Sequence, residues 1–462
     1  MIIAKNRNKT IELLPQMANR HGLIVGSTGS GKTITLRVIA EQFSKIGVPV
    51  FLADVKGDLS GIAVAGNGFY ERATAMELPF EHRNYPVLFW DVFGKEGHPL
   101  RTTIADLGPL LIARLLDLNK VQTGVITLAF KVCHEYLKDS ILLNTKDLKY
   151  LLKHLADNAY DYTTDYGNIN YTSVGAIQRA ILELEVQGVN ELFNLPKFDI
   201  TDFFVTGGDG RGVIHILNAK IIINQPKLYT TFLLWLLSEL YARLPERGDR
   251  DKPLFIFMFD EAHLLFKDIS KVLLDKIESI IRLIRSKGVG IYFVTQSPLD
   301  IPKTVLGQLG NRIQHTLRAF TPEDFNAVNK IAKTFRPNIG LNINDSITSM
   351  GTGEALVSLL QADGTPAIVE KAWIVPPESR IEPLTSEEIN LFVTKSPIFG
   401  KYETKLYKDS DTLKPKNDPR VEKFASNFGR GVVRTMGNQV GREIIRGIFH
   451  TFFKGVRSGV GK

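Results

Sequence analysis

Cysteine and long hydrophobic runs are nearly absent from this chain of 462 residues. Cys133 is the single cysteine, which excludes an internal disulfide and a zinc site built on cysteines. The longest apolar runs, Phe232–Leu237 and Leu254–Phe259, have six residues, whereas a membrane-spanning helix needs about 20. No signal-peptide pattern opens the sequence. We therefore expect a cytoplasmic protein without a transmembrane segment.

The net charge of +8 is concentrated at one end of the chain. Nine Lys or Arg and two Glu lie between Arg420 and Lys462, so this tail carries +7 and the rest is nearly neutral. A basic segment can contact nucleic acid or anionic lipid, although a solvated face is the ordinary interpretation of a charge run. The hydrophobic content of 44% is that of a globular protein, with one large domain or two.

The segment Gly26–Thr33, G-S-T-G-S-G-K-T, matches the P-loop pattern G-x-x-x-x-G-K-[ST] at every fixed position. An apolar strand at 22–25 precedes it, and helical spacing at 34–43 follows, which places phosphates at a helix N-terminus. Lys32 is expected to reach the β- and γ-phosphates of ATP, and Thr33 to bind Mg²⁺. The predicted nucleotide-binding residues are Gly26, Ser27, Thr28, Gly29, Ser30, Gly31, Lys32, Thr33 and Ile34.

Two later strands end in polar residues that suit ATP hydrolysis. The apolar run Leu254–Phe259 leads directly into Asp260 and Glu261. Asp260 is expected to hold Mg²⁺ through water, and Glu261 to polarise the attacking water. Gln296 ends the strand at 291–296 and is predicted to contact the γ-phosphate or that water. The alternative for Gln296 is a structural role at the turn that follows it.

Three arginines are candidates for stabilising the transition state: Arg20, Arg285 and Arg318. Two of them could stabilise the transition state only with a neighbouring subunit. For each one, a surface salt bridge is an equally good interpretation.

Alternating strands and helices indicate an α/β fold with a mostly parallel central sheet. Helical spacing at 107–118, 121–138, 145–157 and 173–187 predicts a helical insertion, with a loop at 158–171. We divide the chain into a first core part (1–99), the insertion (100–205), the rest of the core (206–394), a linker (395–419) and a basic tail (420–462). Strands at 354–360 and 367–374 are expected to form a sheet edge.

The assembled motifs resemble the HerA/FtsK superfamily of ring-forming translocases. They are G-S-T-G-S-G-K-T, A-D-V-K-G-D-L (53–59), F-D-E-A-H (259–263), R-S-K-G-V-G-I-Y-F-V-T-Q-S-P (285–298) and N-R-I-Q-H-T-L-R (311–318). The closer resemblance is to the bacterial HerA-like ATPases typified by YjgR, which extends to M-A-N-R-H-G-L-I before the P-loop and to N-F-G-R-G-V-V-R-T-M-G-N-Q-V-G-R-E-I-I-R-G (427–447).

The resemblance implies a RecA-like P-loop ATPase core that works as a homo-hexamer, with ATP bound between subunits. It places Arg20 and Arg285 at a subunit interface and matches Asp54 to the acidic residue that ends the second strand. HerA proteins carry an N-terminal barrel that docks a nuclease. Because the P-loop begins at residue 26, that barrel is not expected here, which leaves a nuclease partner uncertain.

Two functions follow from these observations. The first is a ring motor that translocates on or pumps double-stranded DNA. The second is an oligomeric ATPase that acts on a protein partner or serves as a nucleotide-driven switch. A small-molecule kinase is disfavoured because no lid with arginines is evident. The tail is expected to form an amphipathic helix that docks on a neighbouring subunit, on its own core or on lipid.

Overall fold

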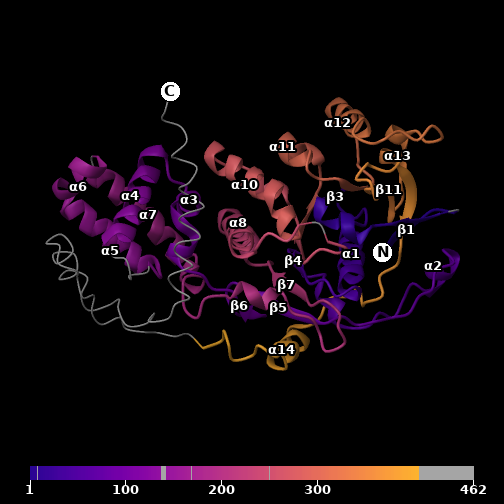
Figure 1. Ribbon diagram of the computed structural model, residues 1–462, viewed down its shortest axis with the longest axis horizontal. Coiled ribbons are helices and arrows are strands. Elements are labelled where there is room, and N and C mark those ends of the chain that lie inside the picture. Colours follow the sequence, from indigo (N-terminus) through magenta and orange to yellow (C-terminus); the bar gives the residue numbers. More distant parts are fainter. Residues whose placement is uncertain (8, 137–141, 168, 249, 405–462) are drawn as a thin grey trace.

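One sheet of twelve strands runs through the part of the chain that the computed structural model describes, with helices on both faces (Figure 1). The described residues are 1–7, 9–136, 142–167, 169–248 and 250–404. The predicted tail at 420–462, with its amphipathic helix, and the predicted linker from residue 405 onward lie outside them. The predicted α/β class with a mostly parallel sheet is confirmed.

The strands follow the spatial order β2-β1-β12-β11-β10-β3-β9-β8-β4-β7-β5-β6. Their bounds, in that order, are Thr10–Glu12, Ile2–Lys5, Glu370–Ile374, Glu354–Ser358, Asn311–Gln314, Gly22–Val25, Val289–Thr295, Phe255–Phe259, Val50–Asp54, Ile214–Asn218, Val87–Asp91 and His98–Pro99.

All pairings from β10 to β6 are parallel. In the centre, Val25 of β3 pairs with Thr295 of β9, and Phe259 of β8 pairs with Phe293 of β9. Parallel strands in register bring their carboxyl ends to one edge of the sheet. The segments that follow β3, β9, β8 and β4 therefore leave the sheet side by side.

Both faces of these central strands are buried, which explains their nearly continuous apolar sequences. Leu23 and Val25 pack into the core on one face, and Ile24 between them packs into the core on the other. Helices α8 and α10 cover the first face, whereas α1 and α14 cover the second.

The helices have the following bounds: α1 Lys32–Lys45, α2 Tyr70–Ala75, α3 Ile104–Leu115, α4 Lys120–Tyr136, α5 Thr145–Asp157, α6 Ala159–Tyr166, α7 Tyr171–Val186, α8 Pro226–Arg243, α9 His263–Phe266, α10 Lys271–Ile284, α11 Lys303–Leu306, α12 Pro322–Ala332, α13 Ile343–Ser349 and α14 Ser386–Thr394. Within the described residues, no helix combines the length and the apolar character needed to cross a bilayer.

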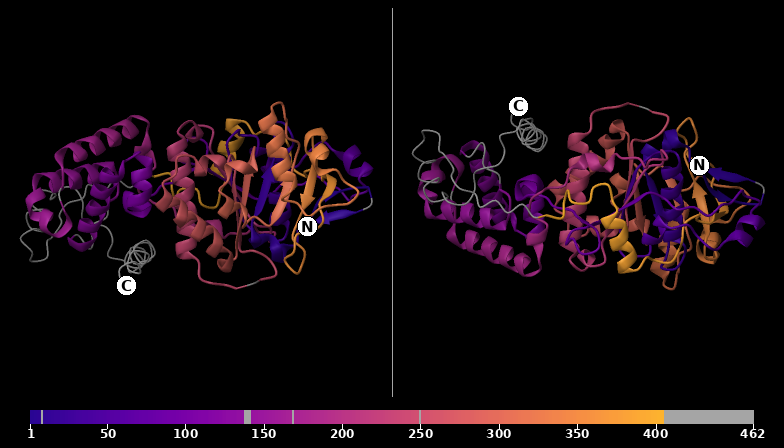
Figure 2. Two further views of the ribbon diagram at one scale, coloured as in Figure 1. Left: turned by 90° about the horizontal axis from the view of Figure 1, so that it is seen from above. Right: turned by 90° about the horizontal axis from the view of Figure 1, so that it is seen from below.

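Helices α3 to α7 follow one another between β6 and β7 and gather at one end of the molecule, far from β3 (Figures 1 and 2). Four of them agree with the predicted helical segments. The predicted loop at 158–171 is wrong, because α6 occupies Ala159–Tyr166. Tyr162 of α6 is buried, and its hydroxyl lies 3.0 Å from His154 Nε2 of α5. This tertiary contact outweighs the weak helix propensity of the segment.

The sheet edge is also different from the prediction. Strands β11 and β12 are internal, because β1 pairs with β12 through Ala4 and Ile374, and β2 pairs with β1. Strands β1 and β2 thus pair with each other and form the outer strands at this edge of the sheet. Their short length gave no strong periodic signal.

Residues 395–404, the first part of the predicted linker, pack against the core. Tyr402 is buried beside Trp90, and the Arg101 guanidinium donates to its carbonyl oxygen at 2.5 Å. Glu403 Oε1 lies 2.5 Å from His98 Nδ1. The chain therefore leaves the described region from a point held against β6.

His215 of β7 is a buried histidine whose hydrogen bonds require the neutral ring. Trp90 Nε1, which can only donate, contacts His215 Nδ1 at 3.1 Å, so the ring N–H is on Nε2, 3.2 Å from Phe203 O. Burial lowers the pKa of His215 to about 3. Because the pKa of His215 in the folded protein is below its value in the unfolded chain, the contribution of this group to stability is fully present above about pH 6.5 and is lost as the pH falls.

We predict that the free energy of unfolding decreases by about 2 kcal/mol between pH 6.5 and pH 5 through this group alone. His215→Gln can keep both hydrogen bonds but cannot titrate, and its unfolding free energy should depend less on pH by this amount. Chemical denaturation of both proteins across this range measures the difference. Identical pH dependence would show that His215 is not held neutral.

Candidate nucleotide-binding site

The P-loop connects β3 to α1 and is held by the neighbouring strands. Gly26 N donates to Thr295 O at 3.3 Å, and Ser27 N donates to Thr316 O at 2.9 Å. Gly29 and Gly31 have φ values of +80° and +111°, a region that favours glycine. Helix α1 begins at Lys32, so its free N–H groups face the loop. This arrangement suits the binding of a phosphate.

Lys32 is buried and turned onto its own loop. Its Nζ donates to Gly26 O at 2.6 Å and to Ser27 O at 3.0 Å. Burial lowers the pKa of Lys32, and the attraction of Glu261 opposes this shift. The ammonium thus already lies inside the loop that would surround the phosphates, and these two carbonyl contacts would be exchanged for phosphate oxygens.

His315 supports the P-loop from the segment after β10, a role that the sequence did not suggest. Its Nδ1 donates to Glu354 O at 2.9 Å, and its Nε2 lies 2.8 Å from the Thr35 hydroxyl of α1. Burial lowers the pKa of His315 to about 4, so Nε2 accepts from Thr35. A Cβ at Gly26 would lie 2.6 Å from His315 Cβ. This close approach requires glycine at position 26.

Asp260 and Glu261 follow β8 at the same edge. Asp260 Oδ1 accepts from Glu261 N at 2.9 Å, and the Tyr229 hydroxyl of α8 donates to Asp260 O at 3.2 Å. Burial, and then the charge of Glu261, raise the pKa of Asp260 to about 7. Tyr229 was not anticipated because no pattern links α8 to this turn.

Glu261 adopts a left-handed backbone conformation with φ +50°, which is strained for a residue with a side chain. Its Oε2 atom is buried and lies 3.3 Å from His263 Nδ1 without hydrogen-bond geometry. The carboxylate therefore has an oxygen that no described protein group satisfies. Such an oxygen can accept from a water molecule.

Gln296 follows β9, the strand between β3 and β8, and its side chain is exposed. The adjacent Ser297 caps the next turn, because its Oγ accepts from Leu299 N at 3.2 Å. The capping role considered for Gln296 thus falls to Ser297. Gln296 is placed at the edge that carries the P-loop and Asp260.

Arg20 and Arg285 lie at the opposite edge. Arg20 ends the 3-10 helix Pro15–Arg20 before β3, and Arg285 begins the 3-10 helix Arg285–Lys287 before β9. The two segments touch, since Asn19 Nδ2 donates to Arg285 O at 3.4 Å. Four to seven strand residues separate this edge from the P-loop, roughly 15–20 Å. Neither arginine is brought to the P-loop of its own chain.

Two further residues have the following placements. Arg318 is exposed on the segment after β10, on the P-loop side of the sheet. Asp54 ends β4 and is buried, with Oδ1 and Oδ2 accepting from Gly57 N at 2.6 Å and Leu59 N at 2.9 Å. Its carboxylate thus closes the following loop.

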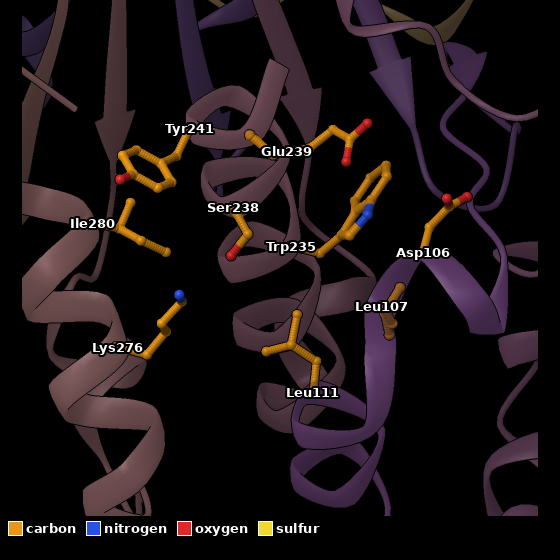
Figure 3. A pocket seen from close by; sticks show the side chains of 10 residues that line it. Asp106, Leu107, Leu111, Trp235, Ser238, Glu239, Tyr241, Lys276 and Ile280 are labelled. Atoms are coloured by element: carbon orange, nitrogen blue, oxygen red, sulfur yellow. The ribbon is translucent and has the colours of Figure 1, made fainter. Parts of the chain in front are cut away.

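A pocket lies elsewhere, between α3, α8 and α10 (Figure 3). Leu111, Trp235, Glu239 and Lys276 are among the residues that line it, and it holds about 10 Å³. That is room for one water molecule and excludes a nucleotide. The P-loop edge remains the candidate site.

The oxygen donors at this edge fit Mg²⁺, which prefers carboxylate and hydroxyl oxygens and keeps several waters. Oδ1 of Asp260 accepts from Glu261 N, which leaves Oδ2 available to the ion. The Thr33 hydroxyl makes no hydrogen bond within the described residues. A bound divalent cation would also favour the ionised form of Asp260. The predicted metal residues are thus compatible with the ion.

The sequence and the fold of this chain are similar to those of known proteins. The sequence model of the helicase HerA-like C-terminal family matches residues 1–418. The chain is 24% identical over 366 residues to the DNA double-strand break repair helicase HerA of Sulfolobus acidocaldarius, covering 77% of this chain and 65% of that protein. The protein of the same name from Sulfurisphaera tokodaii is 24% identical over 352 residues, covering 73% of this chain and 62% of that protein. The chain thus spans just under two thirds of these relatives.

Among solved structures, the bacterial conjugative coupling protein TrwB superposes with a TM-score of 0.52 at 12% identity, covering 83% of this chain and 92% of TrwB. TrwB in complex with a non-hydrolysable ATP analogue gives a TM-score of 0.52 at 14% identity, covering 83% and 92%. At this identity the likeness concerns the fold, which is the RecA-like P-loop fold expected from the motifs. By its sequence over residues 1–418, the chain belongs to the helicase HerA-like C-terminal family.

Proposed function

We propose that this protein is an ATPase that hydrolyses ATP with Mg²⁺ and uses the energy to move on or pump double-stranded DNA as a ring. The observation that carries the proposal is the division of the site between two edges of one sheet. The P-loop, Gln296 and the Asp260–Glu261 pair meet at the carboxyl edge, whereas Arg20 and Arg285 lie on two touching segments at the other.

The residues at the carboxyl edge supply the parts of a hydrolysis reaction. Lys32 and the N–H groups at the start of α1 would bind the β- and γ-phosphates, while Thr33 and Asp260 would hold Mg²⁺. The free oxygen of Glu261 would orient the attacking water, and Gln296 would contact this water or the γ-phosphate. Mg²⁺ would neutralise the charge that develops on the phosphates.

A second copy of the chain would complete the site. Phosphoryl transfer is accelerated by a cation at the γ-phosphate, and the two arginines at the amino edge are too far from their own P-loop. A ring in which this edge faces the next subunit's carboxyl edge brings Arg20 and Arg285 to the bound ATP. Closed cyclic assembly through such unlike surfaces is a common arrangement, and we propose a hexamer.

Double-stranded DNA is the substrate that the relatives favour, because both HerA proteins are described as DNA double-strand break repair helicases. The positive charge of the tail, residues 420–462, suits the binding of a polyanion such as DNA. The nearly neutral body favours instead the second candidate, an oligomeric ATPase that acts on a protein. The two candidates differ in one measurable property, the response of ATP turnover to DNA.

We predict that double-stranded DNA raises the ATP hydrolysis rate of the full chain at least several-fold. Lys32→Ala should abolish hydrolysis with and without DNA, because it removes the ammonium that meets the γ-phosphate. Glu261→Gln should still bind ATP and hydrolyse it very slowly, because only the water-orienting group is lost. Steady-state phosphate release and nucleotide binding measure these effects. Turnover that DNA leaves unchanged supports the protein-directed ATPase.

A mixing experiment tests the placement of the arginines. Arg285→Ala alone should lower the rate roughly a thousandfold or more. Inactive Lys32→Ala and Arg285→Ala subunits should regain activity when mixed, because some interfaces then pair an intact P-loop with an intact arginine. Mass measurement checks that each variant assembles. Rings that form normally but stay inactive after mixing would show that Arg285 does not act between subunits.

A further inference from the structure

The loop between β4 and Ser60 brings a second lysine to the proposed nucleotide site. Leu52 of β4 pairs with Met258 of β8, and continuing this register places Asp54, the last residue of β4, beside Asp260, the residue after β8. Lys56 follows Asp54 by two residues. In the sheet order β3-β9-β8-β4, this loop approaches from the far side of β8 relative to the P-loop.

The loop is held rigidly by groups that do not themselves face solvent. Asp54 closes it through Gly57 N and Leu59 N, at 2.6 Å and 2.9 Å. Arg37 of α1, which is 1% exposed, donates to Asp58 O, and its other amino group donates to Ser379 Oγ at 3.1 Å. The helix that begins at the P-loop thus also positions the loop that carries Lys56.

The Lys56 side chain is exposed and, within the described residues, makes no hydrogen bond or ion pair. It belongs to the loop that leaves the sheet beside Asp260, at the edge that also carries the P-loop. A lysine on this loop that pairs with no carboxylate has its three donors free for an anion.

We propose that Lys56 binds the terminal phosphate of the nucleotide from the Asp260 side and stabilises the charge that develops there during hydrolysis. This inference rests on the proposed ATPase function. Lys32 would contact the phosphates from the P-loop side, and Lys56 would contact the γ-phosphate that ADP lacks. The lysine would therefore distinguish ATP from ADP as well as accelerate the reaction. Asp54 and Arg37 act through Lys56 as positioning residues.

The test compares the full chain with Lys56→Ala, Lys56→Arg and the control Lys95→Ala. Lys95 is an exposed lysine after β5, at the same edge of the sheet but separated from β4 by β7. The kcat of Lys56→Ala should fall about a hundredfold, and its Kd for a non-hydrolysable ATP analogue should rise, with the Kd for ADP unchanged. Lys56→Arg should recover part of the rate, and Lys95→Ala should match the unchanged protein.

The outcomes separate this inference from the proposed function. If the unchanged protein hydrolyses ATP and Lys56→Ala keeps its kcat, the role of Lys56 is overturned while the ATPase stands. If the unchanged protein hydrolyses no ATP, the proposed function fails. In that case, the ratio of the Kd for the ATP analogue to the Kd for ADP alone tests the contact of Lys56 with the terminal phosphate. A ratio that Lys56→Ala leaves unchanged overturns the contact with the terminal phosphate.

Discussion

The parallel pairing of β3, β9, β8 and β4 is the constraint on which the rest of the structure depends. Its backbone hydrogen bonds set the register, and the register places the P-loop, Gln296, Asp260 and Lys56 along one edge. Both faces of these strands are buried, so a shift by one residue would exchange the two faces and misplace every strand end. The site is thus a consequence of how the core packs.

The same topology explains why the candidate arginines do not reach the P-loop of their own chain. Strands of four to seven residues separate the two edges, and no side chain spans that distance. In the proposed ring, the residues before β3 and β9 would therefore serve a different nucleotide from the residues after them. The contact between Asn19 and Arg285 keeps the two arginine-bearing segments together, so that any partner surface meets them as a unit.

Buried polar groups connect α1, the helix that follows the P-loop, to distant parts of the chain. Arg37 of α1 contacts the loop after β4 and the segment around Ser379, and Glu41 accepts from Glu378 N at 3.0 Å and Ser379 N at 3.1 Å. Burial raises the pKa of Glu41, and these hydrogen bonds oppose the shift. Displacing α1 would leave such groups unpaired at a considerable cost. The helix, the Lys56 loop and the segment leading to α14 are therefore expected to move together.

The sequence by itself determined the P-loop, the acidic end of β8 and the order of most strands and helices, because these depend on local patterns of glycine, apolar residues and chain direction. It gave no clear sign of the outer hairpin β1–β2 or of α6, whereas α12 has a local signal in the Thr321–Asp324 capping box. Only the tertiary structure revealed His315 and Tyr229 as supports of the site and placed Arg20 and Arg285 at the far edge. Those facts depend on contacts between residues distant in sequence, which a single sequence does not encode in any local pattern.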